Sequence, residues 1–384
     1  MSKEKSKKFS GPVDSPIYRV FQSPDYNMVF TKFKPYGYKK LGGYQEPDFG
    51  MDFIEHGQLL RWGRTPDDDP DFCKYGPEIA DIEISSGRCN SGCPFCYKEN
   101  GPNEALENMP FEVYKNVLDK IAAPGILTQV ALGLTSVKDH PDLLRIMRYT
   151  RNKGIFANFT ISGSDDSLDY EMAVELADLC GALAVSVTPW NYEQALDKVQ
   201  LFSSLGVEQT NIHVVVSAES MDFVNKVIDA RMTDPRLANM NAVVCLMIKP
   251  KGRAVGKFHP PAQEDYQKLV EKAISNNVPI GFDSCSANRF LDAINKMDLE
   301  EGFKQQMREA SDPCESTCFS IYVNCKGEVT PCSFCEDEPQ YKPINLVEID
   351  DFVKDVWMSD ELKSFRKTLI QNNRSCPAFP SINI

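Results

Sequence analysis

The chain has 384 residues, of which 42% are hydrophobic and 25% charged, which suits a soluble globular protein of two or three domains with a sizeable core. Its formal net charge of −13 argues against a surface that binds duplex nucleic acid, because such a surface needs clustered lysine and arginine. No apolar stretch approaches the roughly 20 residues of a membrane helix, and no apolar segment follows the first lysines, so we expect a cytoplasmic protein without membrane contact.

The first 76 residues divide into two parts. Residues 1–15 contain the one basic run of the chain and predict a disordered tail. Residues 16–76 are rich in aromatic residues, glycine, proline and aspartate, and contain the strand-like runs YRVF and NMVFTKF. We therefore expect a β-rich N-terminal extension.

Short apolar runs alternate with amphipathic segments over residues 77–280. The runs that predict strands are residues 79–85, 127–134, 156–163, 182–188, 211–217 and 242–250. The segments that predict helices are residues 110–121, 141–154, 168–181, 192–206, 221–232 and 264–277. This order predicts an α/β fold of βα units around a parallel sheet. Six units are fewer than a closed eight-stranded barrel needs, so we expect an open, partial (β/α)6 barrel of the TIM type.

The regular pattern stops near residue 280, and residues 281–384 form a small Cys-rich domain. We expect a β-hairpin at FSIYVNCKGEVTPCSF that turns at Lys326-Gly327, and a helix over residues 360–372. This region looks too small to depend on its own apolar core. A metal centre would supply the missing folding energy.

The chain has 13 cysteines, an odd number, and in a reducing compartment metal binding or catalysis explains them better than disulfides do. Cys180 and Cys245 lie in apolar runs and are expected to be buried as small hydrophobic side chains. The sequence suggests no role for Cys73.

Three cysteines follow the first predicted strand of the βα array, in the stretch ISSGRCNSGCPFCY. Cys89, Cys93 and Cys96 are separated by three and then two residues. Three thiolates on a cubane cluster leave one iron without a protein ligand, open to a substrate or cofactor. The alternative is a structural zinc site, but zinc usually takes four closed ligands, often as two CxxC pairs.

The spacing of these cysteines, with an aromatic residue, Phe95, before the third, resembles the motif of the radical S-adenosylmethionine (SAM) superfamily. The resemblance implies a [4Fe–4S] cluster whose open iron binds the amino and carboxylate groups of SAM. One electron then cleaves the sulfonium and releases a 5′-deoxyadenosyl radical that abstracts hydrogen from a substrate.

The same resemblance suggests residues that contact SAM and residues that assist the reaction. In the family a glycine-rich segment, often Gly-Gly-Glu, follows the second strand; here the segment is Ala131-Leu-Gly-Leu-Thr-Ser136, which keeps one glycine and has no acid. The candidate SAM contacts are Phe95, Gly133, Thr135, Ser136, Ser162, Ser186 and Arg253. The weaker candidates for catalysis, polar residues near strand ends, are Asp283, Tyr97 and His213. An ordinary turn, a satisfied core group or a solvated basic loop is the alternative explanation for each.

The spacing of Cys314, Gly327 and Cys332 resembles the opening of the SPASM and twitch cluster domains. The resemblance implies at least one auxiliary [4Fe–4S] cluster, and the single-cluster twitch form is preferred because Cys332-Ser-Phe-Cys335 is the one CxxC pair in this region. The expected ligands are Cys285, Cys314, Cys332 and Cys376. Cys318 and Cys335 are alternatives, and a zinc site is a further alternative.

The resemblance covers residues 77–380, and the pieces DSCSA, PCSF and a late Cys-Pro resemble radical SAM proteins of phages and bacteria. It implies an oxidative modification of a peptide or protein, such as a crosslink, a thioether or a side-chain oxidation, with electrons from a flavodoxin or ferredoxin. One alternative is a small-molecule dehydrogenase or cyclase that acts on a nucleotide, sugar or amino alcohol. Another is a non-catalytic metal scaffold.

Overall fold

A small antiparallel sheet forms the N-terminal part of the described chain. The computed structural model describes residues 13–14, 18–31, 57–65 and 67–383. The sheet has the order β1-β2-β3-β4, with β1 at Val13–Asp14, β2 at Tyr18–Gln22, β3 at Asn27–Thr31 and β4 at Leu59–Trp62. The predicted strand run YRVF lies in β2, and the first five residues of NMVFTKF form β3; the last two, Lys32 and Phe33, lie outside the described residues. Apart from β1, the predicted tail over residues 1–15 lies outside the described residues.

A ten-stranded sheet is the centre of the molecule, with the order β13-β12-β11-β10-β9-β8-β5-β14-β15-β16. Its strands from the βα array are β5 (Ile79–Glu83), β8 (Gln129–Gly133), β9 (Phe156–Ser162), β10 (Cys180–Ser186), β11 (Gln209–Val216), β12 (Val243–Met247) and β13 (Ile280–Phe282). These strands are parallel to one another. Within the described residues no pairing closes the sheet on itself, so the predicted open α/β barrel is confirmed.

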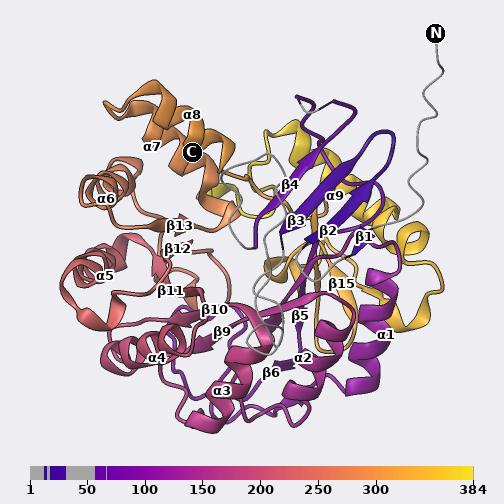
Figure 1. Cartoon of the computed structure of the whole chain (residues 1–384), viewed down its shortest axis with the longest axis horizontal. Helices are drawn as coiled ribbons and strands as arrows, with labels where there is room; N and C mark the ends of the chain where they lie inside the picture. The colour runs from indigo at the N-terminus through magenta and orange to yellow at the C-terminus, as the bar shows by residue number, and fades with distance from the viewer. Residues whose placement is uncertain (1–12, 15–17, 32–56, 66, 384) are drawn as a thin grey trace, which may run out of the picture.

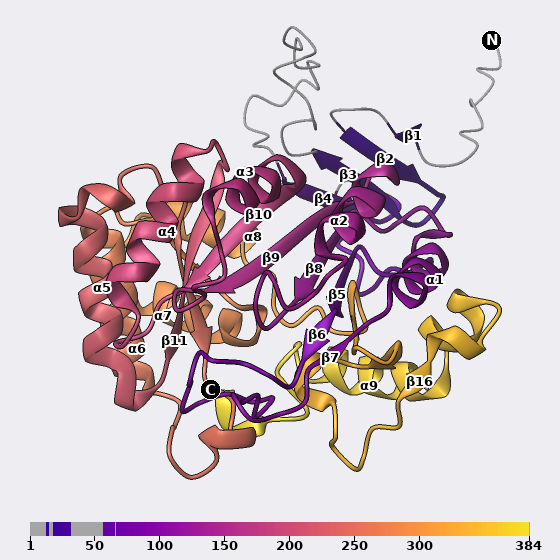
Figure 2. The same cartoon turned by 90° about the horizontal axis from the view of Figure 1, so that it is seen from below.

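Six helices cover the outside of this curved sheet, as Figures 1 and 2 show. They are α1 (Phe111–Ala122), α2 (Leu143–Asn152), α3 (Tyr170–Leu179), α4 (Tyr192–Ser204), α5 (Met221–Thr233) and α6 (Gln263–Ser275). Each buries one apolar face; α1 does so through Tyr114, Val117, Leu118 and Ile121, which recur at helical spacing. Gly154 takes a positive φ of 70° just after α2, which lets the chain leave the helix where the sequence predicts.

The C-terminal region continues the barrel sheet, which the sequence pattern did not indicate. After the short seventh strand β13 come α7 (Ala287–Lys296) and α8 (Glu301–Glu309). The predicted hairpin forms β14 (Ser320–Val323) and β15 (Glu328–Thr330), followed by β16 (Ile344–Asn345) and α9 (Asp360–Gln371). Strand β14 pairs in parallel with β5. The region therefore shares an apolar core with the barrel, because Ile321 and Val323 are buried in the same cluster as Ile82.

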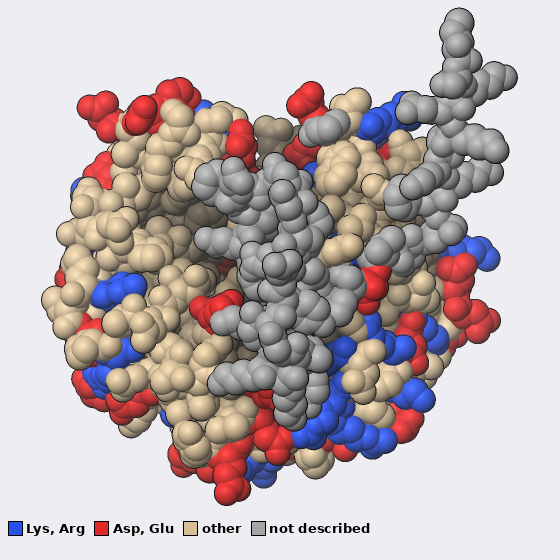
Figure 3. Space-filling model, in the orientation of Figure 1, with Lys and Arg blue, Asp and Glu red and all other residues tan. Residues whose placement is uncertain are grey.

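Charged side chains lie mainly on the outside, and basic residues are interspersed with acidic ones. On the face drawn in Figure 3, blue side chains gather at the lower right with red ones beside them. Two arginines of α2 are examples of this mixing, because Arg145 pairs with Glu112 and Arg148 pairs with Glu175. Among the described residues, no helix combines the length and the apolar character that crossing a membrane demands.

Candidate active site

Cys89, Cys93 and Cys96 lie on the loop that leaves the carboxyl end of β5, the edge where βα barrels hold their chemistry. We call residues 84–106 the cluster loop. Strands β6 (Ser85–Ser86) and β7 (Glu107–Asn108) pair at its base. Gly87 permits this closure, because a Cβ there would lie 1.9 Å from the carbonyl oxygen of Ala105 and its φ is +87°. The loop is thus fixed at its base while its three thiols stay partly accessible.

The electrostatics of the three thiols suit a shared metal centre. Burial and the nearby Cys96 and Cys89 together raise the pKa of the Cys93 thiol to about 12, against the opposite effect of Arg253. Neighbouring thiols that repel one another as thiolates need a cation between them, and iron favours thiolate ligands. In the described part of the chain no three side chains already form a complete metal-ligand group. Such thiols converge when a metal binds, because metal binding and local folding are coupled.

The loop after β12 braces the cluster loop. The Arg253 guanidinium donates to two loop carbonyl oxygens, from Nη1 to that of Cys93 at 3.0 Å and from Nη2 to that of Asn100. Its backbone amide donates to the carbonyl oxygen of Cys96 at 3.1 Å. Gly252 allows the approach, since a Cβ there would lie 2.6 Å from the Cys96 carbonyl oxygen. Arg253 is one of the candidate SAM contacts named from the sequence. In the structure its guanidinium lies against the backbone between the thiols and binds these loop carbonyls.

Phe95 stands in an aromatic group beside the thiols. Its ring centroid lies 6.2 Å from that of Trp190 and 5.7 Å from that of Phe258. Trp190, in the turn between β10 and α4, donates from Nε1 to the carbonyl oxygen of Ser91 at 3.0 Å. Its ring remains 45% exposed, so one aromatic face beside the cluster loop is open. Sequence reasoning missed Trp190, although a tryptophan directly after a strand end was a usable signal.

The predicted auxiliary ligands come together from four separate segments. Burial raises the pKa of Cys285 to about 12, with further contributions from the nearby Cys332 and Cys376. Burial likewise raises the pKa of Cys314, and the same three thiols add to the shift. The two sulfur atoms of Cys332 and Cys335 are 3.5 Å apart, so Cys335 stays an alternative ligand. This set offers four or five soft donors, which fits a cubane cluster closed by protein.

The other cysteines stand apart from this group. The pKa of Cys318 is raised by burial, and its strongest charged neighbours are Arg374 and Arg366 rather than another thiol. Cys325 lies near Glu83 and Lys98. Cys180 and Cys245 are buried in the barrel core, where the sequence placed them. Cys73 is fully buried in a second apolar cluster and accepts, through its carbonyl oxygen, the Nε1 proton of Trp357 at 2.7 Å.

Comparison with known families and structures bears on both thiol groups. Residues 314–378 match SPASM, an iron–sulfur cluster-binding domain. SuiB of Streptococcus suis bound to the precursor peptide SuiA has 14% identity and a TM-score of 0.62, over 92% of this chain and 90% of that one. SuiB bound to S-adenosylmethionine has 14% identity and a TM-score of 0.58, over 76% of this chain and 68% of that one.

A third structure, native anSMEcpe with bound AdoMet and a Kp18Cys peptide, has 15% identity and a TM-score of 0.55, over 80% of this chain and 88% of that one. Residues 314–378 thus match the SPASM domain, and the chain shares the fold of SuiB and anSMEcpe, which are solved with S-adenosylmethionine (AdoMet) bound. The resemblance seen in the sequence is therefore confirmed at the level of fold and domain. A search of curated proteins finds no match.

The candidate SAM contacts after β8 are partly committed to other partners. Thr135 donates from its hydroxyl to Asp139 at 3.2 Å, and Ser136 donates to Asp165 at 3.1 Å. These bonds fix the loop after the strand, so neither hydroxyl proton is free for a ligand. Gly133 is exposed on the inner face, beside Glu83 of β5.

Ser162, Ser186 and His213 lie side by side across β9, β10 and β11. Thr160 lies 3.3 Å from Nδ1 of His213. Burial lowers the pKa of His213 to about 4, although Asp283 opposes the shift. Because the imidazole is neutral near pH 7, it suits hydrogen bonding better than proton donation.

The remaining two candidates for catalysis have structural partners. Asp283 forms a buried ion pair with Lys249 and accepts a hydrogen bond from the Ser286 hydroxyl at 2.7 Å. Tyr97 packs on Phe334 of the SPASM domain, with ring centroids 4.3 Å apart, and burial raises its pKa to about 12. Tyr97 is therefore protonated near pH 7, and the Asp283 carboxylate is held by Lys249 and Ser286.

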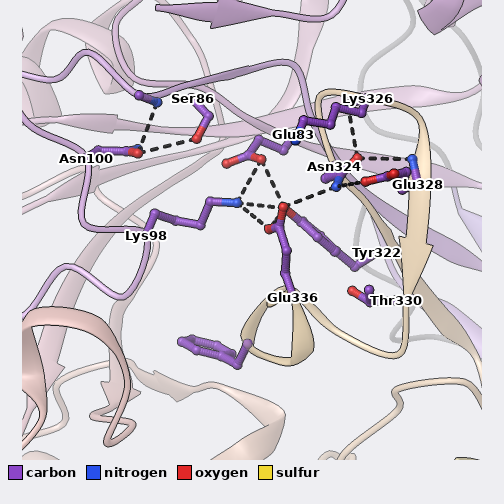
Figure 4. A network of polar contacts seen from close by, with 12 residues as sticks. Glu83, Ser86, Lys98, Asn100, Tyr322, Asn324, Lys326, Glu328, Thr330 and Glu336 are labelled. Atoms are coloured by element: carbon purple, nitrogen blue, oxygen red, sulfur yellow. Dashed lines mark hydrogen bonds and ion pairs between the residues drawn. The ribbon is translucent and has the colours of Figure 1, made fainter. Parts of the chain in front are cut away.

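A buried polar network joins the cluster loop to the SPASM domain, as Figure 4 shows. Lys98, two residues after Cys96, forms ion pairs with Glu83 at 2.9 Å and with Glu336. The Tyr322 hydroxyl lies 3.1 Å from Glu83 and 2.9 Å from Glu336, and Asn324 donates to Glu336 at 3.1 Å. Burial would raise the pKa of Glu336, but Lys98 outweighs it and lowers that pKa. This network fixes the SPASM domain against the strand that leads to the thiols.

Sequence reasoning also missed two carboxylates on β5. Asp81 and Glu83 alternate with the buried Ala80 and Ile82, so both face the inside of the barrel. The signal was present in the run IADIE, whose period of two we interpreted as an ordinary buried strand.

Proposed function

We propose that this chain is an enzyme that cleaves SAM reductively and uses the resulting radical to modify a peptide or protein oxidatively. The observation that carries the proposal is the pairing of two thiol groups in one fold. One group has three cysteines on a partly accessible loop at the carboxyl end of β5. The other brings Cys285 together with Cys314, Cys332 and Cys376 of the SPASM domain.

Residues of this chain would hold the cofactors as follows. Cys89, Cys93 and Cys96 would bind a [4Fe–4S] cluster with one open iron, and Cys285, Cys314, Cys332 and Cys376 would bind a closed auxiliary cluster. When bound, these groups would supply one-electron chemistry, fed by a flavodoxin- or ferredoxin-type reductant, for the reductive cleavage of SAM and for removal of an electron from the oxidised substrate.

The protein's part is to position the groups and to exclude water. Arg253 and Gly252 hold the backbone of the cluster loop at the spacing its thiols need. Phe95 and Trp190 offer an aromatic surface next to that loop for the adenine or another planar part of SAM. Ser186 and the neutral His213 are available on the inner face for hydrogen bonds to the ribose or the substrate.

The peptide class of substrate is supported by two of the similar structures, SuiB and anSMEcpe, which are solved with bound peptides. It is also supported by the gathered thiols of the SPASM domain, because a second closed cluster fits a net oxidation of the product. The reducing interior of a cell is the setting in which 13 free cysteines and oxygen-sensitive clusters persist.

The test is anaerobic reconstitution of the full chain with iron and sulfide, followed by reduction with dithionite in the presence of SAM. We expect 5′-deoxyadenosine to form, and to form faster with a peptide library than with pooled nucleotides, sugars and amino alcohols. Faster turnover with the metabolite pool would favour a small-molecule enzyme. Absence of deoxyadenosine from protein with a full iron content would leave a metal scaffold and overturn the proposal.

A further inference from the structure

Asp81 is a carboxylate in the middle of a central strand of the sheet, on the inner face of the barrel. In the register of the sheet it stands beside Ala131 of β8 on one side and Tyr322 of β14 on the other. It lies two residues before Glu83, hence roughly 6.6 Å deeper in the barrel than the start of the cluster loop. The inner face beneath the loop is where a substrate must enter if the proposed function holds.

Asp81 and Glu83 share a strand and a face, yet their surroundings differ. Glu83 is 8% exposed and is neutralised by Lys98. Asp81 is solvent-accessible, and it has no hydrogen-bond or ion-pair partner in the part of the chain that the structure describes. Protein atoms nevertheless surround it, and this desolvation, together with Glu315, raises its pKa to about 6. An unpaired carboxylate in such a place costs free energy, which is typical of groups kept for binding or catalysis.

Space and charge around Asp81 both favour a cationic ligand. Ala131 and Gly133 on the neighbouring strand carry little or no side chain, and Gly133 is itself exposed on this inner face. The basic groups that approach the region are already bound. Lys98 pairs with Glu83 and Glu336, Arg61 pairs with Glu78, Asp312 and Glu315, and Lys249 pairs with Asp283. The charge of Asp81 is therefore left without a counterion from the described protein.

We propose that Asp81 is the receptor for a protonated amine of the substrate, and that in a peptide substrate this amine is the side chain of lysine. This inference rests on the proposed function, because it places the substrate in the barrel beneath the cluster loop. Lysine carries its charge on a flexible four-carbon stem, which lets the ammonium reach into the barrel while the peptide backbone stays near the loop. The interaction is an ion pair that water reaches only in part, so it is stronger than one on the outer surface.

The experiment measures binding by the reconstituted protein with SAM present, without turnover. The probes are the peptide Ac-Gly-Gly-Lys-Gly-Gly-NH2, its counterpart with norleucine, which keeps the stem and lacks the charge, and free n-pentylamine. We expect the lysine peptide to bind the unmodified chain at least about fivefold more tightly than either the norleucine peptide or the free amine. In Asp81→Asn the lysine-to-norleucine ratio should fall to about one.

Two controls make the result interpretable. Asp178→Asn removes the same charge from the exposed face of α3 and should leave the lysine preference intact. The affinity of Asp81→Asn for SAM and its iron content should equal those of the unmodified chain. A lysine preference that survives in Asp81→Asn, a loss of SAM affinity in that variant, or equal binding of pentylamine and the lysine peptide would each overturn the proposal. Because deoxyadenosine formation is measured separately, failure here is distinct from failure of the proposed function.

Discussion

Three cysteines on one loop and at least four cysteines from distant segments make up the two thiol groups of this protein. The first group spans eight residues, stays partly accessible and is braced through backbone carbonyls by Arg253. The second is drawn from residues 285 to 376, and only Cys314 and the alternative ligand Cys335 are buried in it. Three thiols on one loop suit a site that must admit SAM and a substrate, whereas four or five thiols from separate segments suit a closed cluster. The polar network around Lys98 connects the two.

The largest effect should come from removing the loop thiols. Replacing Cys89, Cys93 and Cys96 together with alanine should reduce deoxyadenosine formation to background, because no cluster would present an open iron to SAM. The measurement is chromatography of anaerobic reactions, with iron counts on the same samples. Cys245→Val, at a buried barrel position, should keep activity. Undiminished SAM cleavage by the triple variant would contradict the assignment of the loop thiols to the catalytic cluster.

Removing one buried thiol should separate the functions of the two groups. Cys314→Ala should lower the iron content by about four per chain, yet leave SAM cleavage without substrate detectable, because the loop thiols are untouched. Cys318→Ala should retain all iron, since arginines rather than thiols surround that residue. Equal iron loss in both variants would show that our assignment of Cys318 is incorrect.

Breaking the network between the two regions should destabilise the protein strongly. Lys98→Met leaves Glu83 and Glu336 without their counterion, and should lower the free energy of unfolding by about 3–5 kcal/mol. Anaerobic urea denaturation measures the change. Lys153→Met breaks the exposed pair with Asp119 and should cost less than about 1 kcal/mol. Similar losses in the two variants would mean that the network does not hold the SPASM domain in place.

Asp81→Asn should stabilise the protein near neutral pH. The pKa of this carboxyl is about 6 when folded, against an ordinary value of 3.8, so its charge opposes folding above pH 6 and this cost disappears as the pH falls toward 4. We expect a gain on the order of 1 kcal/mol at pH 7.5, less than the shift alone implies because solvent reaches the side chain, and no gain at pH 4. Urea denaturation at the two pH values is the measurement, and destabilisation at pH 7.5 would indicate an ordinary structural role.

The smallest effect should come from Ser136→Ala. Because the Ser136 hydroxyl is already bound to Asp165, its loss should change the dissociation constant of SAM by less than about twofold. Equilibrium dialysis with reconstituted protein would measure this constant. A larger loss of affinity would return Ser136 to the group of SAM contacts that the family resemblance suggested.

The sequence by itself determined the local features: six βα units, the cluster loop after the first strand, and the hairpin at Lys326-Gly327. These follow from patterns within about 20 residues, such as apolar periodicity, turn glycines and cysteine spacing. The predicted helix over residues 110–121 agrees with α1 for this reason. The grouping of the three loop thiols also follows from a short stretch of sequence, because Cys89, Cys93 and Cys96 lie within eight residues.

Only the tertiary structure decided which distant groups meet. The pairing of β14 with β5, the gathering of Cys285 with Cys314 and Cys376, and the binding of Arg253 to loop carbonyls depend on how the open sheet curves. The difference between Asp81 and Glu83 also depends on tertiary structure, because Lys98 pairs with Glu83 and not with Asp81. Strand periodicity gives the face of a side chain but not the groups that approach that face from other elements, and those groups set its charge and its function.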